Sequence, residues 1–165
     1  ASHRLASAAG RASPCSSKTR GFERMFVNRR TVHIEWGDCD AAGIVFYPRY
    51  FDMFDHSTMM LFEAVGYKKH DVLRNYDFRG WPMVDTRARF IIPSTFGDDL
   101  VIATQVVEFG RTSFKVEHKG YRGDELALEG WETRVWTGNH PDDPKKLKAR
   151  PMPDEIKAAL SRSNV

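Results

Sequence analysis

Long hydrophobic runs are missing from this sequence. No stretch of about 18 apolar residues occurs, so we expect no transmembrane helix. Cysteine is scarce: Cys15 lies near the start of the chain and Cys39 in its body, and we expect no disulfide between them. Free thiols are typical of a reducing compartment, which favours the cytoplasm. The Cys-x-x-Cys, P-loop and dinucleotide-binding signatures are absent too, so no metal or nucleotide motif is indicated.

The sequence is instead well supplied with apolar and aromatic residues. Hydrophobic residues make up 41% of the 165 and aromatic residues 12%, which is enough for the core of one domain. The net charge of +3 is unevenly distributed, because residues 1–24 hold five basic residues and one acid. Residues 25–165 hold 20 basic and 21 acidic residues. Since this body is nearly neutral, we expect no nucleic-acid partner.

Residues 1–24 differ from the rest in composition. Ala, Ser, Gly and Arg dominate them, and they lack the apolar segment of a secretory signal. We expect a flexible or extraneous basic leader here, whether an organelle transit peptide, a segment added by cloning or upstream translation. Met25 is the first methionine, and regular patterning begins just after it. The sequence therefore predicts one domain over residues 25–165.

The patterning of that domain predicts an α+β fold. Apolar and polar residues alternate over Thr31–Trp36, as in a half-buried strand. An apolar run at helical spacing then extends from Pro48, which suits the first turn of a helix, to Gly66, which ends it. Four further strands and a short helix are expected at Met83–Ile92, Leu100–Phe109, Ser113–Tyr121, Leu126–Thr137 and Asp154–Ser161. This order predicts an antiparallel sheet wrapped around one long helix, with edge strands that favour dimers.

The densest polar segment, Asp38-Cys39-Asp40, lies between the first strand and the long helix. The helix dipole favours a carboxylate at this place, and free backbone N–H groups there can hold an oxyanion. The segment could therefore combine a nucleophile or base with electrostatic stabilisation. The alternative is that Asp38 and Asp40 only cap turns. No histidine adjoins Cys39 in the sequence, so a half-buried thiol is favoured over a nucleophile.

The run Trp-Gly-Asp-Cys-Asp-Ala-Ala-Gly-Ile-Val-Phe-Tyr-Pro-Arg-Tyr at residues 36–50 resembles the 4-hydroxybenzoyl-CoA thioesterase family of hotdog-fold proteins. The pieces Phe90-x-x-Pro93 and Gly97-Asp98-x-Leu100 continue the match, which covers residues 29 to about 152. The resemblance implies a hotdog fold and hydrolysis of an acyl-CoA without a cofactor. It also implies a homodimer or homotetramer with its active site between subunits.

The resemblance implies that Asp40 is the catalytic carboxylate, either as a nucleophile that forms a mixed anhydride or as a general base for water. The backbone N–H of Tyr47 would polarise the thioester carbonyl, and Gly43 would allow close approach. Asp38 would shape the turn. Because a thiolate leaving group has a pKa of roughly 8.5, it needs little acid assistance, and no Ser-His-Asp constellation is required.

Three further positions bear on the acyl group. Pro48 follows the motif tyrosine, where a related branch acting on short-chain acyl-CoA has histidine, so Pro48 favours an aryl-CoA. Asp55 matches a family position near the polar end of the acyl group, although a solvated helix face is the alternative. Trp81 stands where the family has a small hydroxyl residue. This substitution implies a reshaped acyl pocket and leaves the acyl group open.

The phosphates of CoA would be met by two basic segments. Arg111-Thr112-Ser113 matches a basic family segment, with Thr112 in place of a lysine. Lys148 aligns with a basic residue near the nucleotide, and Arg150 belongs to the same run. Without the resemblance, such a run is typical of a solvated face.

Other functions are less favoured. His56 could join Asp52 or Asp55 in a metal site, but the spacing is generic and pairing on the helix surface is favoured, so no metal site is expected. A CoA-linked hotdog dehydratase would need a His/Glu or His/Asp pair, which the motif loop lacks. A non-catalytic acyl-CoA-binding module is the remaining alternative.

Overall fold

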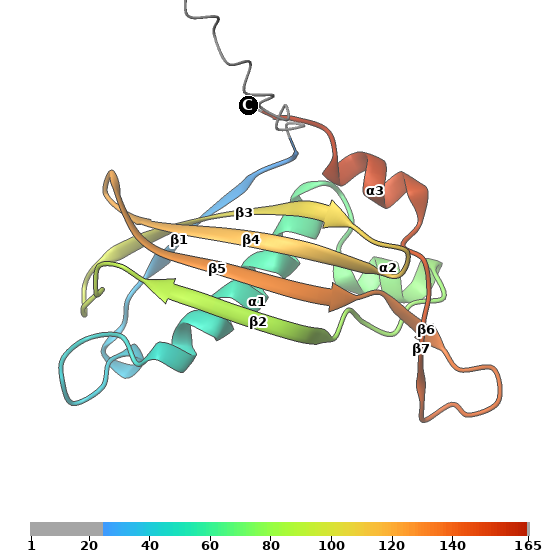
Figure 1. The fold of residues 1–165 in the computed structure, drawn as a ribbon, viewed down its shortest axis with the longest axis horizontal. Helices are drawn as coiled ribbons and strands as arrows, with labels where there is room; N and C mark the ends of the chain where they lie inside the picture. Colours follow the sequence, from blue (N-terminus) through green and yellow to red (C-terminus); the bar gives the residue numbers. More distant parts are fainter. Residues whose placement is uncertain (1–24, 165) are drawn as a thin grey trace, which may run out of the picture.

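A five-stranded antiparallel sheet curves around one long helix in the computed structural model, which describes residues 25–164 (Figure 1). The expected leader at residues 1–24, with Cys15, lies outside the described residues. The strands are β1 (Asn28–His33), β2 (Met83–Phe90), β3 (Asp99–Phe109), β4 (Ser113–Arg122), β5 (Glu125–Val135), β6 (Thr137–Asn139) and β7 (Leu147–Ala149). The helices are α1 (Tyr47–Ala64), α2 (Lys69–Asn75) and α3 (Asp154–Leu160), with a 3-10 turn, η1, at Trp36–Asp38.

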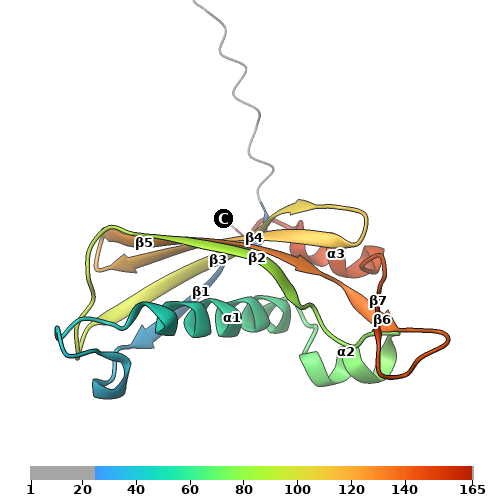
Figure 2. The same cartoon turned by 60° about the horizontal axis from the view of Figure 1, so that its bottom comes forward.

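The order of the strands leaves β1 and β2 at the two edges. The main sheet runs β1-β3-β4-β5-β2, every neighbouring pair is antiparallel, and β6 and β7 form a separate two-stranded sheet. Helix α1 lies along one face of the main sheet, as Figure 2 shows. Side chains along β2 are mostly exposed, so this edge strand is uncovered by the described part of the chain. No helix in residues 25–164 is long and apolar enough to cross a membrane.

The core between helix and sheet consists of two apolar clusters with a polar layer between them. Phe54 belongs to the cluster near the start of α1, and Phe62 belongs to an aromatic cluster further along the helix. Between them on α1 lies Thr58, which is fully buried. Thr104 and His118 are also fully buried at the same level of the sheet. Because buried polar groups are costly unless they are paired, this layer needs its own partners, which are described below.

Most expected elements are confirmed, with small differences at their ends. The long helix begins one residue before Pro48 and ends at Ala64, and Gly66 follows it with a φ of +94°. The first strand was expected to extend to Trp36, but it ends at His33, and the exposed Trp36 begins η1. This boundary is wrong because the alternating pattern continues past the point where pairing with β3 ends.

The last long strand was expected to continue to Thr137, but it divides at Trp136. The Trp136 N–H donates to the Thr112 carbonyl at 2.8 Å, and β6 then pairs with β7 in a separate sheet. Helix α2 and the pair β6–β7 were not expected. β6 and β7 have three residues each, too few to show a periodic pattern, and α2, unlike α3, has no proline before it to mark its start.

Gly130 on β5 makes room for the helix. A Cβ at this position would lie 2.5 Å from Cε2 of Phe54, whose ring is fully buried and stacks on His118 with centroids 4.5 Å apart. We therefore expect Gly130→Ala to lower the free energy of unfolding by about 1–3 kcal/mol. Urea denaturation measures this change, with Gly37→Ala as the control, because a Cβ added at Gly37 would meet no other atom within 4 Å. Equal stability of the two variants would contradict the packing described here.

Candidate active site

The acidic loop before α1 folds as a tight hairpin around Asp40. The Asp40 N–H donates to the Ile44 carbonyl at 3.0 Å, and the Gly43 N–H donates back to the Asp40 carbonyl at 2.9 Å. Gly43 has a φ of +77°, a conformation that side chains disfavour, so glycine suits this position. The Asp40 side chain is exposed, and its Oδ1 accepts a hydrogen bond of 2.8 Å from the Ala42 N–H. The hairpin therefore holds one carboxylate oxygen and presents the group to solvent.

Asp38 has a different environment. Its Oδ2 accepts a hydrogen bond of 2.9 Å from the Glu35 N–H, which closes the 3-10 turn η1. Its carbonyl accepts the N–H of Phe46 at 2.8 Å. Asp38 thus shapes the turn, as the sequence predicts, and Asp40 remains the available carboxylate of the pair.

Helix α1 begins beside this loop with an uncapped N-terminus. Phe46 is the N-cap residue and offers no side-chain hydrogen bond, and Pro48 in the first turn has no N–H. The Tyr47 N–H has no acceptor among the described residues. A free donor at the positive end of a helix dipole is suited to an oxyanion. The chain therefore places a carboxylate loop and a free N–H at one end of α1.

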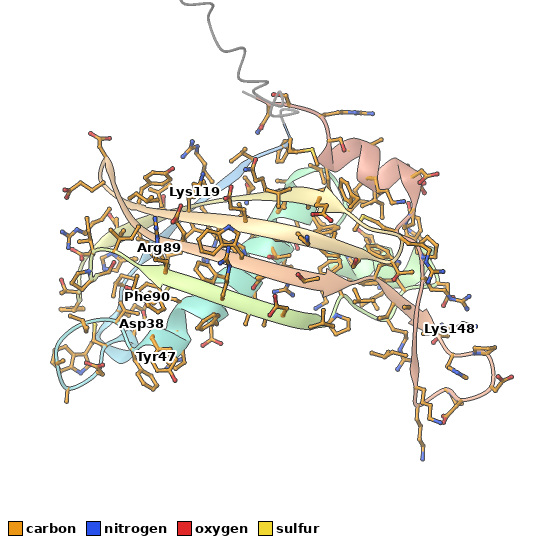
Figure 3. The ribbon with its side chains drawn as sticks, in the orientation of Figure 1. Asp38, Tyr47, Arg89, Phe90, Lys119 and Lys148 are labelled. Atoms are coloured by element: carbon orange, nitrogen blue, oxygen red, sulfur yellow. The ribbon has the colours of Figure 1, made fainter. Side chains whose placement is uncertain are left out.

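An apolar groove of about 200 Å³ adjoins this end of the helix. Its lining residues are Ile44, Val45, Tyr47, Tyr50, Phe90, Ile91, Ile92 and Pro93. The rings of Tyr50 and Phe90 lie 5.3 Å apart, so α1 and β2 meet along the groove. Figure 3 shows Asp38, Tyr47 and Phe90 together at this end of the molecule. The groove offers an apolar surface next to the polar groups of the loop.

The basic residues expected to meet CoA lie at the opposite end of the molecule. Lys148 on β7 is far from Tyr47 in Figure 3. Arg111 and Thr112 lie in the turn between β3 and β4, and Ser113 begins β4; this turn approaches the same end through the Thr112–Trp136 hydrogen bond. Arg111 and Lys148 are exposed. Arg111 and Lys148 therefore lie at the end away from the acidic loop, and the structure does not bring the two groups together within one copy.

Arg150 at this basic end is already engaged. Its Nε lies 3.2 Å from Oδ2 of Asp77, and its Nη2 donates to the Asn139 carbonyl at 3.2 Å. The backbone N–H of Asn139 is the main cause that lowers the pKa of Asp77, and Arg150 contributes further. Arg150 thus helps to fix the loop that carries β6 and β7.

The remaining expected residues lie in other environments. Asp55 is on α1, two turns after Tyr47, and is exposed. Trp81 is buried in the aromatic cluster, with its ring stacked on Phe62 at a centroid distance of 4.4 Å. Asp52 pairs with Arg49 at 3.7 Å on the helix surface. Within residues 25–164, no three His, Cys, Asp or Glu side chains gather as a metal site would require.

A buried charged cluster was not expected from the sequence. Glu132 on β5 accepts hydrogen bonds at its Oε2 from Nε of Arg134 at 2.8 Å and from the hydroxyl of Thr58 at 3.1 Å. Nε2 of His118 lies 3.3 Å from the same oxygen. The Arg134 guanidinium continues to the surface, where Nη1 lies 2.8 Å from Oδ1 of Asp55. The clue in the sequence is that Glu132 and Arg134 occupy inward positions of β5, in phase with the buried Leu128.

Burial and pairing set the charges in this cluster. Burial lowers the pKa of His118, so its ring is neutral near pH 7. Burial raises the pKa of Glu132, but hydrogen bonds from His118 and Arg134, together with the charge of Arg134, outweigh it and lower that pKa to about 2. Burial also opposes the charge of Arg134, yet Glu132 and Asp55 raise its pKa above the usual value. The cluster therefore holds one buried carboxylate, one guanidinium and one neutral imidazole.

These shifts predict that acid destabilises the protein in two stages. The folded pKa of His118 is below its unfolded value of 6.5, so the unfolded chain binds a proton that the folded site does not as the pH falls below 6.5. We expect the free energy of unfolding to fall by up to about 1.4 kcal/mol per pH unit there. Glu132, with an unfolded value of 4.5, adds a second loss between pH 4.5 and about 2.

Thermal unfolding at pH 7.5 and 5.5 measures the first stage. His118→Gln keeps a polar group beside Thr104 and Glu132 but does not titrate, so its stability should change less between the two pH values. His70→Gln is the control, because His70 is an exposed residue that pairs with Asp71 on the surface. If His118→Gln and wild type lose the same stability on acidification, His118 is not the titrating group.

The combination of a long helix held in an antiparallel sheet, with an acidic loop at the helix N-terminus, is that of the hotdog-fold thioesterases. The chain belongs to the thioesterase-like superfamily, whose sequence pattern matches residues 34–160. It is similar to 4-hydroxybenzoyl-CoA thioesterase of Pseudomonas sp. strain CBS-3, with 32% identity over 126 residues, 73% of this chain and 87% of that protein.

Solved structures give the same relationship. The structure of that Pseudomonas enzyme has a TM-score of 0.72 at 28% identity, covering 81% of this chain and 99% of the other. An Asp-to-Asn variant of 4-hydroxybenzoyl-CoA thioesterase in complex with 4-hydroxybenzoyl-CoA has a TM-score of 0.73 at 29% identity, covering 81% and 98%. A gentisyl-coenzyme A thioesterase has a TM-score of 0.70 at 27% identity, covering 82% and 100%. The expected family and hotdog fold are thereby confirmed.

Proposed function

We propose that this protein hydrolyses an acyl-CoA, preferably an aryl-CoA, to the free acid and CoA. The observation that carries the proposal is that an exposed Asp40 carboxylate and the free Tyr47 N–H lie at the same end of α1. The relatives named above are CoA thioesterases, which supports the same reaction class here.

The reaction begins when the Tyr47 N–H donates a hydrogen bond to the thioester carbonyl oxygen. Asp40 then either attacks the carbonyl carbon or takes a proton from a water that attacks it. In both routes the C–S bond breaks, and the CoA thiolate leaves without strong acid assistance. In the first route water hydrolyses the mixed anhydride and returns Asp40 to its starting form. One water is consumed in either case, and no cofactor takes part.

A second copy of the chain would complete the site. β2 is an uncovered edge strand, and exposed strand edges pair readily with other strands. An antiparallel pairing of β2 with β2 of a second copy would place the acidic end of one copy beside the basic end of the other. Arg111, Ser113 and Lys148 of that second copy would then meet the CoA phosphates while the thioester lies at Asp40. A homodimer, alone or within a tetramer, is therefore the proposed active form.

The spacing along α1 suits an aromatic acyl group. Tyr47, Phe51 and Asp55 follow at intervals of four residues, so they lie on one side of the helix. The rise from Tyr47 to Asp55 is about 12 Å at about 1.5 Å per residue. A rigid acyl group with a polar substituent opposite the carbonyl could lie along this side of the helix.

The test is direct. The protein is incubated with benzoyl-CoA, 4-hydroxybenzoyl-CoA, acetyl-CoA and palmitoyl-CoA, and a thiol reagent follows the release of CoA. We expect the highest kcat/KM with an aryl-CoA. Release of CoA from acetyl-CoA or palmitoyl-CoA alone would overturn the aryl preference, and release from none of the four would overturn the function.

Cys39 is a free thiol, which supports a reducing compartment and hence the cytoplasm as the place of reaction.

A further inference from the structure

The ion pair between Arg134 and Asp55 joins the inside of the protein to its surface. Arg134 keeps only 3% of its side-chain surface exposed, whereas Asp55 keeps 65%. An exposed carboxylate on a helix normally samples several rotamers, and surface ion pairs hold it weakly. Here the partner is a buried guanidinium that the core cannot easily move. Asp55 therefore has a fixed orientation that its neighbours on the helix surface lack.

The position of Arg134 is itself fixed by groups behind it. Glu132 accepts a hydrogen bond from Nε of Arg134, and the Glu132 carboxylate is in turn held by Thr58 and His118. Nη2 of Arg134 is buried and has no hydrogen-bond partner among the described residues. The guanidinium thus bonds to Glu132 on its inner side, which fixes its orientation, and to Asp55 on its outer side.

We propose that Arg134 is a positioning residue for substrate selection: it holds Asp55 as a fixed hydrogen-bond acceptor for a hydroxyl group on the acyl part of the thioester. This inference rests on the proposed thioesterase function and extends it to a named residue in the core. Arg134 acts through Asp55, so it influences which acyl group is preferred and leaves the reaction at Asp40 unchanged. The buried cluster of Glu132, His118 and Thr58 supports that role from within the core.

The experiment compares two pairs of ligands that differ only in a para-hydroxyl group. The kcat/KM ratio of 4-hydroxybenzoyl-CoA to benzoyl-CoA gives the preference during turnover. The Kd ratio of 4-hydroxyphenacyl-CoA to phenacyl-CoA, thioethers that water does not cleave, gives the same preference without turnover. Binding with preference but no thiol release would overturn the thioesterase function and keep the role of Arg134.

Three variants and a matched control are measured with both pairs. We expect Asp55→Asn to lower the preference by about 10- to 100-fold, since it removes a charged acceptor. Arg134→Lys keeps a positive charge beside Glu132 but loses the planar guanidinium that bonds to Glu132 and Asp55 at once, so the preference should fall by about threefold or more. The double variant should match Asp55→Asn alone. Asp52→Asn, one turn earlier on the same helix and paired with Arg49, should leave the preference unchanged.

Several results would overturn the inference. An unchanged preference in Asp55→Asn would show that Asp55 does not meet the acyl group. A further loss caused by Arg134→Lys in the Asp55→Asn background would show that Arg134 does not act through Asp55. Equal losses for both ligands, with no change in their ratio, would indicate a purely structural role. If Arg134→Lys does not fold, Asp55→Asn with its Asp52→Asn control still decides whether the acceptor exists.

Discussion

Replacing Asp40 with Asn is expected to lower kcat for aryl-CoA hydrolysis by about 10³-fold or more, with little change in KM. The amide has the size of the carboxylate but is neither a nucleophile nor a base, so both routes of the proposed reaction stop. Asparagine can still accept the Ala42 N–H, which bonds to Asp40 in the hairpin. The loop should therefore keep its conformation, and the thermal midpoint should stay close to that of wild type.

Asp38→Asn is the matched control in the same loop. The Asp38 carboxylate accepts the Glu35 N–H within η1, and an asparagine oxygen can accept the same bond. We expect this variant to keep activity within about tenfold of wild type, since no step of the reaction uses its charge. Steady-state thiol release decides between the two residues. Loss of activity in Asp38→Asn together with an active Asp40→Asn would reverse the assignment.

Breaking the outer edge of β2 is expected to give a monomer with kcat/KM lowered by about 10²-fold or more, because the CoA-binding residues of the second copy are lost. Thr86→Pro and Arg87→Pro test this together. Successive residues of an edge strand direct their N–H groups to opposite sides of the strand. One proline therefore removes a backbone hydrogen bond to β5, and the other removes only an N–H that faces outward, toward the second copy. The variant with the outward change should remain folded and become monomeric.

Analytical ultracentrifugation gives the mass and the thiol assay gives the activity. The same two-proline scan at Thr31 and Val32 on β1, the opposite edge of the sheet, is the control. It should leave at least one folded variant that is still a dimer and still active. A fully active β2 monomer would contradict a site shared between copies.

Much of the fold could be predicted because its periodic signals are strong. The helix between Pro48 and Gly66 has an apolar pattern at helical spacing, and the four long strands β2 to β5 extend over eight or more residues. The structure confirms all five elements. Helix α2 and the β6–β7 pair are too short for such a signal. Their positions depend on contacts such as the Trp136–Thr112 hydrogen bond, which joins residues far apart in the sequence.

The candidate site likewise has one part that a local motif predicts and one part that depends on the whole fold. Asp40, Gly43 and Tyr47 lie within eight residues, so a local motif could identify the loop and the helix start. The position of Lys148 at the other end of the molecule could not be found from its sequence neighbours, because it depends on the path of five strands between them.

The charged cluster was missed for a different reason. A glutamate and an arginine in a strand normally face water, so the phase of Glu132 and Arg134 with Leu128 did not by itself predict that they face inward. His118 is in phase with the apolar Phe114 and Val116 along β4, which is the one local sign of its burial. Its partners could not be identified from that pattern.

The central claim, a thioesterase site shared by two copies, has a direct test in hybrid dimers. Asp40→Asn and the double variant Arg111→Ala/Lys148→Ala carry different tags, are expressed together and are purified through both tags. A shared site predicts one intact site in each hybrid, with kcat/KM at about half the wild-type value although both parent proteins are impaired. Hybrids of Asp40→Asn with Asp40→Ala should stay inactive. Hybrid activity no higher than the average of the two parents would contradict the shared site.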